Sequence, residues 1–220
     1  MKIVAFIPYW FGYNNINEVK KLGGRYLINY TLEQLNDCDI IDEVVIYSSD
    51  ERIMEFVEEK EFMRFEKRPT FLDSKEIKIE QIIEEFLKTS DADVVVLIHP
   101  NSPFLSKVTI LECIDNVLSN KFDSSFIAYK FNKLAWFKNK PLNYKITENT
   151  PHLAEVDPVI LELSSLYVFR KEMFLNTHRR IGENPFIKFI DHFEGHDINN
   201  KEDFEMAELI VNSGMYPKAN

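Results

Sequence analysis

The segment DVVVLIHPNSPFL, which runs from Asp93 to Leu105, decides the fold class. Its first part, Asp93 to Ile98, is a short apolar run rich in β-branched residues, which is typical of a strand buried on both faces of a parallel sheet. Pro100 and Pro103 prevent the chain from continuing as sheet, because proline cannot donate a ladder hydrogen bond. The segment therefore predicts a central strand that ends in a polar loop.

Similar strands and intervening helices are expected on both sides of this segment. The other expected strands are residues 2–7, 43–47, 124–129 and 159–169. Apolar residues at helical spacing, with Asp50 capping one helix and Ser106 opening another, predict helices over residues 26–35, 51–59, 77–87, 106–118, 171–175 and 201–211. We interpret residues 61–74 as irregular. The alternation of strands and helices predicts βαβ units and a doubly wound α/β sheet.

Length and charge restrict the possible functions. With 220 residues, of which 45% are hydrophobic, the chain is long enough for one well-filled domain, 1–220, and too apolar for disorder. Its 26 basic and 36 acidic residues give a net charge of −10, which disfavours binding of nucleic acid or an anionic membrane. A phosphate ligand would require a local group of basic side chains or a divalent cation. No apolar stretch approaches the roughly 18 residues of a membrane span, and we expect a cytoplasmic protein.

Ligands of open α/β sheets bind outside the carboxyl ends of the strands. Here this rule selects the loops 8–22, 48–50, 99–103 and 196–199. The sequence contains neither G-x-G-x-x-G after the first strand nor G-x-x-x-x-G-K-[ST], so the usual dinucleotide and P-loop sites are excluded. It also lacks H-E-x-x-H and G-x-S-x-G, the signatures of zincins and α/β-hydrolases.

These loops lie within a series of fragments that resembles a known family, the CMP-sialic acid (acylneuraminate) synthetases, which are cytidylyltransferases for acidic sugars. The fragments occur in the family's order over nearly the whole chain. They are IP (7–8), KLGGRYLINYTLEQL (21–35), EVVIYSSDERI (43–53), KRP (67–69), HPNSPFL (99–105), SSLYVF (164–169) and HDINNKEDFEMAE (196–208). The resemblance implies a Rossmann-like, doubly wound mixed sheet of the nucleotide-diphospho-sugar transferase type.

The resemblance also implies an activity, a metal and an assembly. Family members join CTP to a sugar-acid hydroxyl and release pyrophosphate, so positioning and charge neutralisation at the α-phosphate are the protein's main tasks. Mg²⁺ is the implied cofactor. Residues 131–158, where regular patterning stops, match the small β-rich excursion through which family members form homodimers.

The implied metal ligands are Asp197 and Asn199. Family members usually carry Asp-Ile-Asp before the last helix, whereas this chain has Asp197-Ile198-Asn199. The amide of Asn199 can still offer an oxygen to Mg²⁺, although without charge. Alternatively, Asn199 or Asn200 caps the following helix.

The first loop departs further from the family pattern of Pro-Ala-Arg, Gly-Ser-Lys and Lys-Asn. Nucleotide contacts are still expected there, from Pro8, Trp10, Gly12 and Asn17. Trp10 stands near the family's arginine and Asn17 near its second lysine, so two expected cations are missing. Lys21, for which the resemblance suggests a catalytic role, and its neighbour Lys20 either reach the triphosphate or are solvated.

The remaining expected contacts lie farther along the chain. Arg68 matches the family's Arg-Pro, where a guanidinium can contact a phosphate, and its alternative is a surface arginine. Ser74 is a nucleotide contact or a helix cap. His99 replaces the family's substrate-contacting glutamine, and its imidazole could bind the sugar acid or accept a proton from its hydroxyl. Asn101 and Ser102 are expected beside it.

Two other clusters have alternative interpretations. FNKLAWFKNKP (131–141) mixes aromatic residues with lysines, which can indicate nucleic-acid stacking, although the acidic balance opposes it. The resemblance implies a homodimer contact here instead, because the corresponding region builds the dimer in family members. Arg179-Arg180 could hold a substrate carboxylate or lie in a solvated turn. We therefore expect a dimeric, Mg²⁺-dependent cytidylyltransferase for an acidic sugar. The alternatives are a nucleotidyltransferase for another acceptor and a catalytically silent nucleotide-binding homologue.

Overall fold

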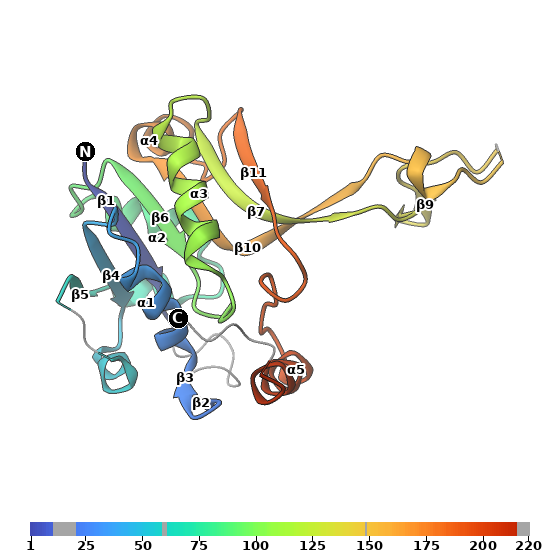
Figure 1. Cartoon of the computed structure of the whole chain (residues 1–220). Helices are drawn as coiled ribbons and strands as arrows, with labels where there is room; N and C mark the ends of the chain where they lie inside the picture. Colours follow the sequence, from blue (N-terminus) through green and yellow to red (C-terminus); the bar gives the residue numbers. More distant parts are fainter. Residues whose placement is uncertain (11–20, 59–60, 148, 215–220) are drawn as a thin grey trace.

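The computed structural model describes residues 1–10, 21–58, 61–147 and 149–214. Its centre is a seven-stranded sheet in the order β11-β7-β10-β6-β1-β4-β5 (Figure 1). These strands are β1 (Ile3–Pro8), β4 (Glu43–Ser48), β5 (Met63–Lys67), β6 (Val94–Ile98), β7 (Ser124–Phe131), β10 (Val159–Arg170) and β11 (Pro185–Phe189). Strand β10 runs antiparallel to β6 and β7, whereas the other neighbouring pairs are parallel. The predicted mixed sheet is confirmed.

Helices cover both faces of this sheet, as a doubly wound fold requires. They are α1 (Leu27–Asn36), α2 (Ile79–Leu87), α3 (Lys107–Leu118) and α4 (Lys171–Thr177). Helix α5 (Lys201–Asn212) packs in a separate cluster with Leu22, Leu27 and Phe104. The chain also has the 3₁₀ turns η1 (Glu51–Phe56), η2 (Thr70–Asp73) and η3 (Leu153–Glu155), the last of them within residues 131–158. Along β6, Val96 packs with α1 and α3 on one face, and Val95 packs with α2 and α4 on the other. A strand buried on both faces explains the unbroken apolar run that the sequence shows.

The caps at two helix starts confirm the boundaries expected there. The Ser106 hydroxyl accepts a hydrogen bond from the Thr109 backbone N–H at 3.2 Å at the start of α3. Asp50 accepts one from the Arg52 N–H at 3.0 Å, although the helix that it caps is the 3₁₀ turn η1 rather than an α-helix over 51–59. Asn200 caps α5 through the Asp203 N–H at 2.9 Å, so the capping role does not fall to Asn199.

Two strands of the seven-stranded sheet were not predicted, and both lie at its edges. The segment interpreted as irregular contains β5, which pairs with β4, and β11 pairs with β7. Arg64, Glu66 and Lys67 give β5 a charged surface, and Pro185 begins β11. An edge strand needs only one neighbour and can carry charges or proline, so its sequence lacks the long apolar run of a central strand.

The excursion over residues 131–158 forms an arm that projects from the body (Figure 1). The distal ends of β7 and β10 pair from Phe131 with Val159 to Ala128 with Glu162, and the short hairpin of β8 (Trp136–Phe137) and β9 (Lys140–Pro141) lies farther out. The remaining small hairpin, β2 (Lys21–Leu22) and β3 (Arg25–Tyr26), precedes α1. Within the described residues, no helix has both the length and the apolar character that a membrane span needs.

Candidate active site

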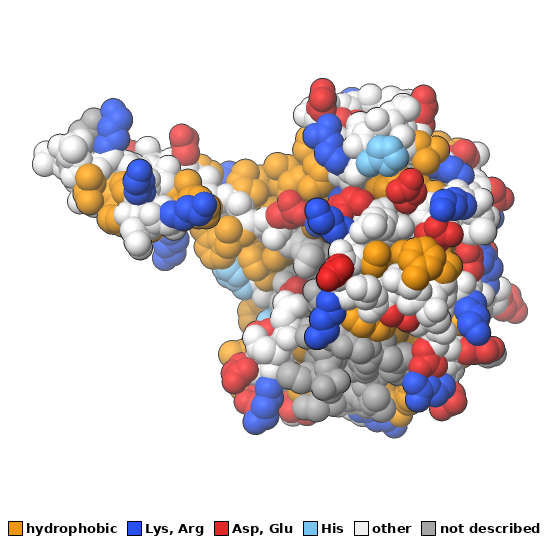
Figure 2. All heavy atoms as spheres, turned by 180° about the vertical axis from the view of Figure 1, so that it is seen from behind, with side chains coloured by type: hydrophobic (Ala, Val, Ile, Leu, Met, Phe, Trp, Pro, Cys, Tyr) orange, Lys and Arg blue, Asp and Glu red, His pale blue; other side chains and the backbone are white. Residues whose placement is uncertain are grey.

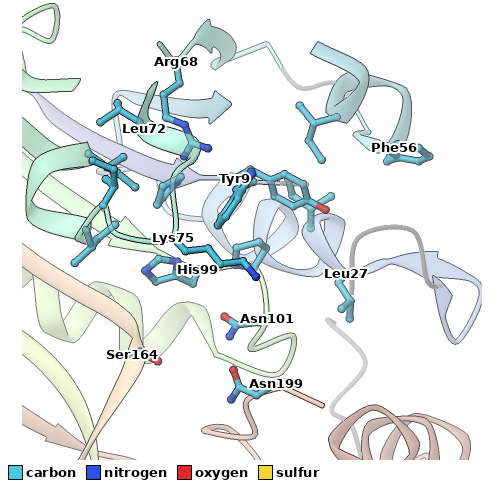
Figure 3. Close-up of a pocket in the computed structure, with 18 of the residues that line it drawn as sticks. Tyr9, Leu27, Phe56, Arg68, Leu72, Lys75, His99, Asn101, Ser164 and Asn199 are labelled. Carbon is cyan, nitrogen blue, oxygen red and sulfur yellow. The ribbon is translucent and has the colours of Figure 1, made fainter. Parts of the chain in front are cut away.

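Strands β1, β5 and β6 direct their carboxyl ends toward one pocket of about 410 Å³ (Figure 3). Pro8 and Tyr9 enter its wall from the end of β1, Arg68 follows β5, and the loop beginning at His99 follows β6. The pocket therefore occupies the position where ligands of α/β sheets bind. Asn199, from the loop before α5, and Ser164, from β10, complete the opposite side (Figure 3).

The pocket is locally cationic, although the chain has a net charge of −10. Arg68 and Lys75 line it, and no Asp or Glu is among the described residues of its wall. Both cations come from the connection between β5 and α2. Because the chain is acidic overall, we expected a phosphate ligand to need either a local group of basic side chains or a divalent cation. The connection between β5 and α2 supplies two basic side chains.

Arg68 is a buried arginine, not the surface residue that was its alternative interpretation. Only 2% of the residue is exposed, and its backbone N–H donates to the Ser48 carbonyl at 2.9 Å. One guanidinium nitrogen is paired with Asp73, while Nε is buried and has no hydrogen-bond partner within the described part of the chain. A buried donor without a partner is costly, and a ligand oxygen in the pocket would satisfy it.

Asn101 presents the complementary group on the β6 side. Its Oδ1 atom is buried and lacks a hydrogen-bond partner among the described residues. Beside it, burial and the nearby Arg180 charge lower the pKa of His99 to about 4, so its imidazole is neutral at pH 7. A neutral imidazole can accept a proton or a hydrogen bond on one nitrogen and donate on the other. This side of the pocket is therefore suited to a polar, hydroxyl-bearing ligand.

Asp197 and Ser102 lie behind this wall rather than in it. The Asp197 carboxylate accepts hydrogen bonds from Asn199 Nδ2 at 2.9 Å and from the Ser102 hydroxyl at 3.3 Å. Ser102 is buried and also shares a short hydrogen bond with Ser165 of β10. Burial, together with the Asp203 charge, raises the pKa of Asp197. Asn199 lines the pocket and connects Asp197 to it.

The groups at Asp197 fit a magnesium ion that is shared with a substrate phosphate. Mg²⁺ in such sites takes one or two protein carboxylates, with phosphate oxygens and water as the other ligands. Within the described ranges there is no cluster of three or more His, Cys, Asp or Glu residues suited to a metal. Asp197 forms no ion pair with a described Lys or Arg, so its charge is left for a cation that the Asn199 amide oxygen could also contact.

Only some of the other residues predicted to contact the nucleotide or to act in catalysis line the pocket. Pro8, Trp10 and Ser74 line the pocket. Ser74 is not the cap of α2, because that helix begins at Ile79 after Lys78. Lys21 does not line the pocket, and its ammonium lies 4.9 Å from the ring centre of Tyr26, which does. The predicted contacts of Gly12 and Asn17 lie outside the described residues.

Sequence reasoning missed the aromatic wall and one cation. Tyr9, Tyr26 and Phe56 line the pocket, with the rings of Tyr26 and Phe56 5.1 Å apart in an edge-to-face arrangement. The position of Tyr9 just after the first strand was visible in the sequence, but nothing indicated that η1 would pack against α1 and place Phe56 beside Tyr26. Lys75 was missed although Ser74 beside it had been selected.

A mixed α/β sheet with a cationic pocket at its carboxyl edge is an arrangement that nucleotide-binding α/β proteins use. The model of the cytidylyltransferase family matches residues 18–177, so this chain belongs to the cytidylyltransferase family. A curated relative, the post-translational flagellin modification protein B of Campylobacter coli, is 19% identical over 217 residues. The match covers 91% of this chain and 89% of the relative.

Solved structures share the fold. A CMP:2-keto-3-deoxy-manno-octonic acid synthetase complexed with CTP matches with a TM-score of 0.71 and 13% identity, over 97% of this chain and 100% of that one. The 2-C-methyl-D-erythritol 4-phosphate cytidylyltransferase of Francisella tularensis matches with a TM-score of 0.65 and 15% identity, over 95% and 99%. The 4-diphosphocytidyl-2C-methyl-D-erythritol synthase of Anaerococcus prevotii gives 0.63 and 17%, over 96% of both chains. The expected fold class is confirmed.

Proposed function

We propose that this protein transfers CMP from CTP to a hydroxyl of an acidic sugar and releases pyrophosphate. The observation that carries the proposal is the pocket wall, which has two cations and no acidic side chain among its described residues in a chain of net charge −10. Such a wall suits a triphosphate. Because the chain belongs to the cytidylyltransferase family, we infer that the nucleotide is a cytidine nucleotide.

An acidic sugar is the acceptor that one structural neighbour and the polar groups of the pocket support. The structural neighbour with the TM-score of 0.71 is a synthetase of a CMP-linked sugar acid. The neutral imidazole of His99 and the unpartnered Oδ1 of Asn101 suit a hydroxyl-rich ligand. In the reaction the acceptor oxygen forms a bond to the α-phosphorus of CTP, and the bond from that phosphorus to the pyrophosphate oxygen breaks.

Individual side chains would then have separate tasks. Arg68 would hold a phosphate through its buried Nε, and His99 would accept the hydroxyl proton or orient the hydroxyl. Asp197 and Asn199 would hold Mg²⁺, which, when bound, neutralises phosphate charge. We further propose that the enzyme is a homodimer that meets through the arm, and that it acts on small molecules in the cytoplasm.

Pyrophosphate release tests this function. The protein is incubated with CTP, Mg²⁺ and a panel of sugar acids, with 2-C-methyl-D-erythritol 4-phosphate as a further acceptor. We expect release that requires both a sugar acid and Mg²⁺ and that falls at least a hundredfold in Asp197→Ala, because that variant loses the carboxylate beside the pocket. Asp115→Ala, which removes an exposed acid of α3, is the matched control and should retain full activity.

Each other outcome identifies an alternative. Turnover only with the erythritol phosphate would assign a different acceptor. CTP binding that raises the melting temperature, without turnover on any acceptor, would indicate a silent nucleotide-binding homologue. Absence of CTP binding would contradict the nucleotide assignment itself.

A further inference from the structure

Lys75 has no acidic partner among the described residues, unlike four other lysines of the chain. Lys2, Lys88, Lys188 and Lys201 each form an ion pair with a carboxylate. Lys75 is exposed, and no ion pair or hydrogen bond joins its ammonium to another described residue. Its side chain extends across the pocket, between Tyr9 on one wall and Asn101 on the other (Figure 3). The ammonium is therefore directed into a ligand site and carries an unneutralised charge.

The other cation of the pocket is already partly neutralised. Arg68 is paired with Asp73, so the guanidinium brings orientation and a free Nε but little net charge. A triphosphate carries several negative charges and needs further positive charge close to its oxygens. In the first loop, Trp10 contributes an aromatic ring to the pocket wall and no charge. Lys75 is the described lining residue that can supply this charge.

We propose that Lys75 binds the β- and γ-phosphates of CTP and thereby contributes positive charge that Trp10, which stands near the family's arginine, does not provide. This inference rests on the proposed function, because it assumes that the pocket takes a nucleoside triphosphate. The phosphates are favoured over the acceptor because Lys75 comes from the same short connection as Arg68. A phosphate chain that passes from Arg68 toward Asn199 crosses the part of the pocket that the lysine side chain spans (Figure 3).

Calorimetric titration with two nucleotides tests the proposal. CTP and CMP share the base, the ribose and the α-phosphate, so only their difference reports on the outer phosphates. In Lys75→Ala we expect CTP to bind about tenfold more weakly, as for the loss of one charge-assisted hydrogen bond at a partly exposed site, and CMP affinity to change less than twofold. Lys75→Arg should restore most of the CTP affinity.

Lys78→Ala is the matched control. Lys78 is exposed, lies three positions further along the same connection and is not part of the pocket wall. Its side chain makes no capping hydrogen bond to α2, so its truncation leaves the helix start unchanged. This variant should bind both nucleotides as the wild type does.

The possible contrary results are distinct. Unchanged CTP affinity in Lys75→Ala overturns the proposal and leaves the proposed function intact if the wild type releases pyrophosphate. An equal loss for CTP and CMP also overturns it, because the lysine would then act on the shared part of the nucleotide. A raised KM for the sugar acid, with CTP affinity unchanged, reassigns Lys75 to the acceptor. Wild-type protein that binds no CTP contradicts the proposed function together with this role.

Discussion

His99 connects the central sheet to the pocket. Its backbone N–H donates to the Ser165 carbonyl of β10 at 2.9 Å, and its side chain lines the pocket. Burial and the Arg180 charge lower its pKa to about 4, from an ordinary value near 6.5. The family pattern has glutamine here, which is also neutral and also both donates and accepts hydrogen bonds. Burial therefore makes the histidine similar to the amide that it replaces.

The lowered pKa of His99 predicts a pH-dependent stability. Between pH 6.5 and about 4 the unfolded chain binds a proton at this residue and the folded chain does not, so stability falls as the pH is lowered. Between pH 7 and 5 the wild type should lose up to about 2 kcal/mol more unfolding free energy than His99→Gln. Urea unfolding of both proteins at several pH values measures this difference. Parallel curves would contradict the neutral, buried imidazole.

At the scale of elements, a buried amide attaches η1 to α1 and so fixes part of the aromatic wall. Asn29 of α1 is 2% exposed. Its Nδ2 donates to the Phe56 carbonyl at 2.9 Å, and its Oδ1 accepts from the Glu58 N–H at 2.9 Å. Phe56 and Ile53 of η1 line the pocket, so the position of this wall depends on a residue of the neighbouring helix.

Removing this amide should destabilise the fold. Asn29→Ala removes the two hydrogen bonds that the buried amide makes to the backbone groups of Phe56 and Glu58, which we expect to lower the unfolding free energy by about 2 kcal/mol. Asn36→Ala, at the exposed end of the same helix, should change it by less than about 0.5 kcal/mol. Urea unfolding at pH 7 compares the two variants. An Asn29→Ala protein as stable as the control would show that η1 is held by other contacts.

The elements that the sequence predicted are those whose signal is local. Strands β1, β4 and β6 carry their own apolar runs, and α3 and α5 carry their own caps. Edge strands β5 and β11 depend on pairing with distant segments, which a single sequence does not display. The same distinction applies to the site. His99 follows a predicted strand directly and Arg68 belongs to a short motif of its own, so both were found, whereas Phe56 and Lys75 enter the pocket from segments whose direction is fixed only by tertiary packing.

At the scale of the whole molecule, charge and apolar surface are separated in space. The pocket is cationic, although acidic residues predominate in the chain as a whole. The arm presents large apolar side chains to solvent: Trp136, Phe137, Leu142, Ile146 and Leu153 are between 47% and 66% exposed. Figure 2 shows hydrophobic side chains at the base of the arm, continuous with those of the adjoining body, and basic side chains farther out. An exposed apolar surface on a projecting element is typical of an interaction site.

The exposed apolar surface of the arm therefore predicts that the protein forms a homodimer. Burying its aromatic side chains against a second copy would remove apolar surface from water, which stabilises association by about 25 cal/mol per Å². We expect light scattering after size-exclusion chromatography to give about twice the 26.0 kDa of one chain at micromolar concentration.

The double variant Trp136→Asp and Phe137→Asp should give the mass of one chain, because charges in the contact would be buried without partners. Lys140→Asp, on the adjoining strand β9, changes charge without removing apolar area and should remain dimeric. A wild-type protein with the mass of one chain, or an aspartate double variant that stays dimeric, would show that the arm does not form the contact.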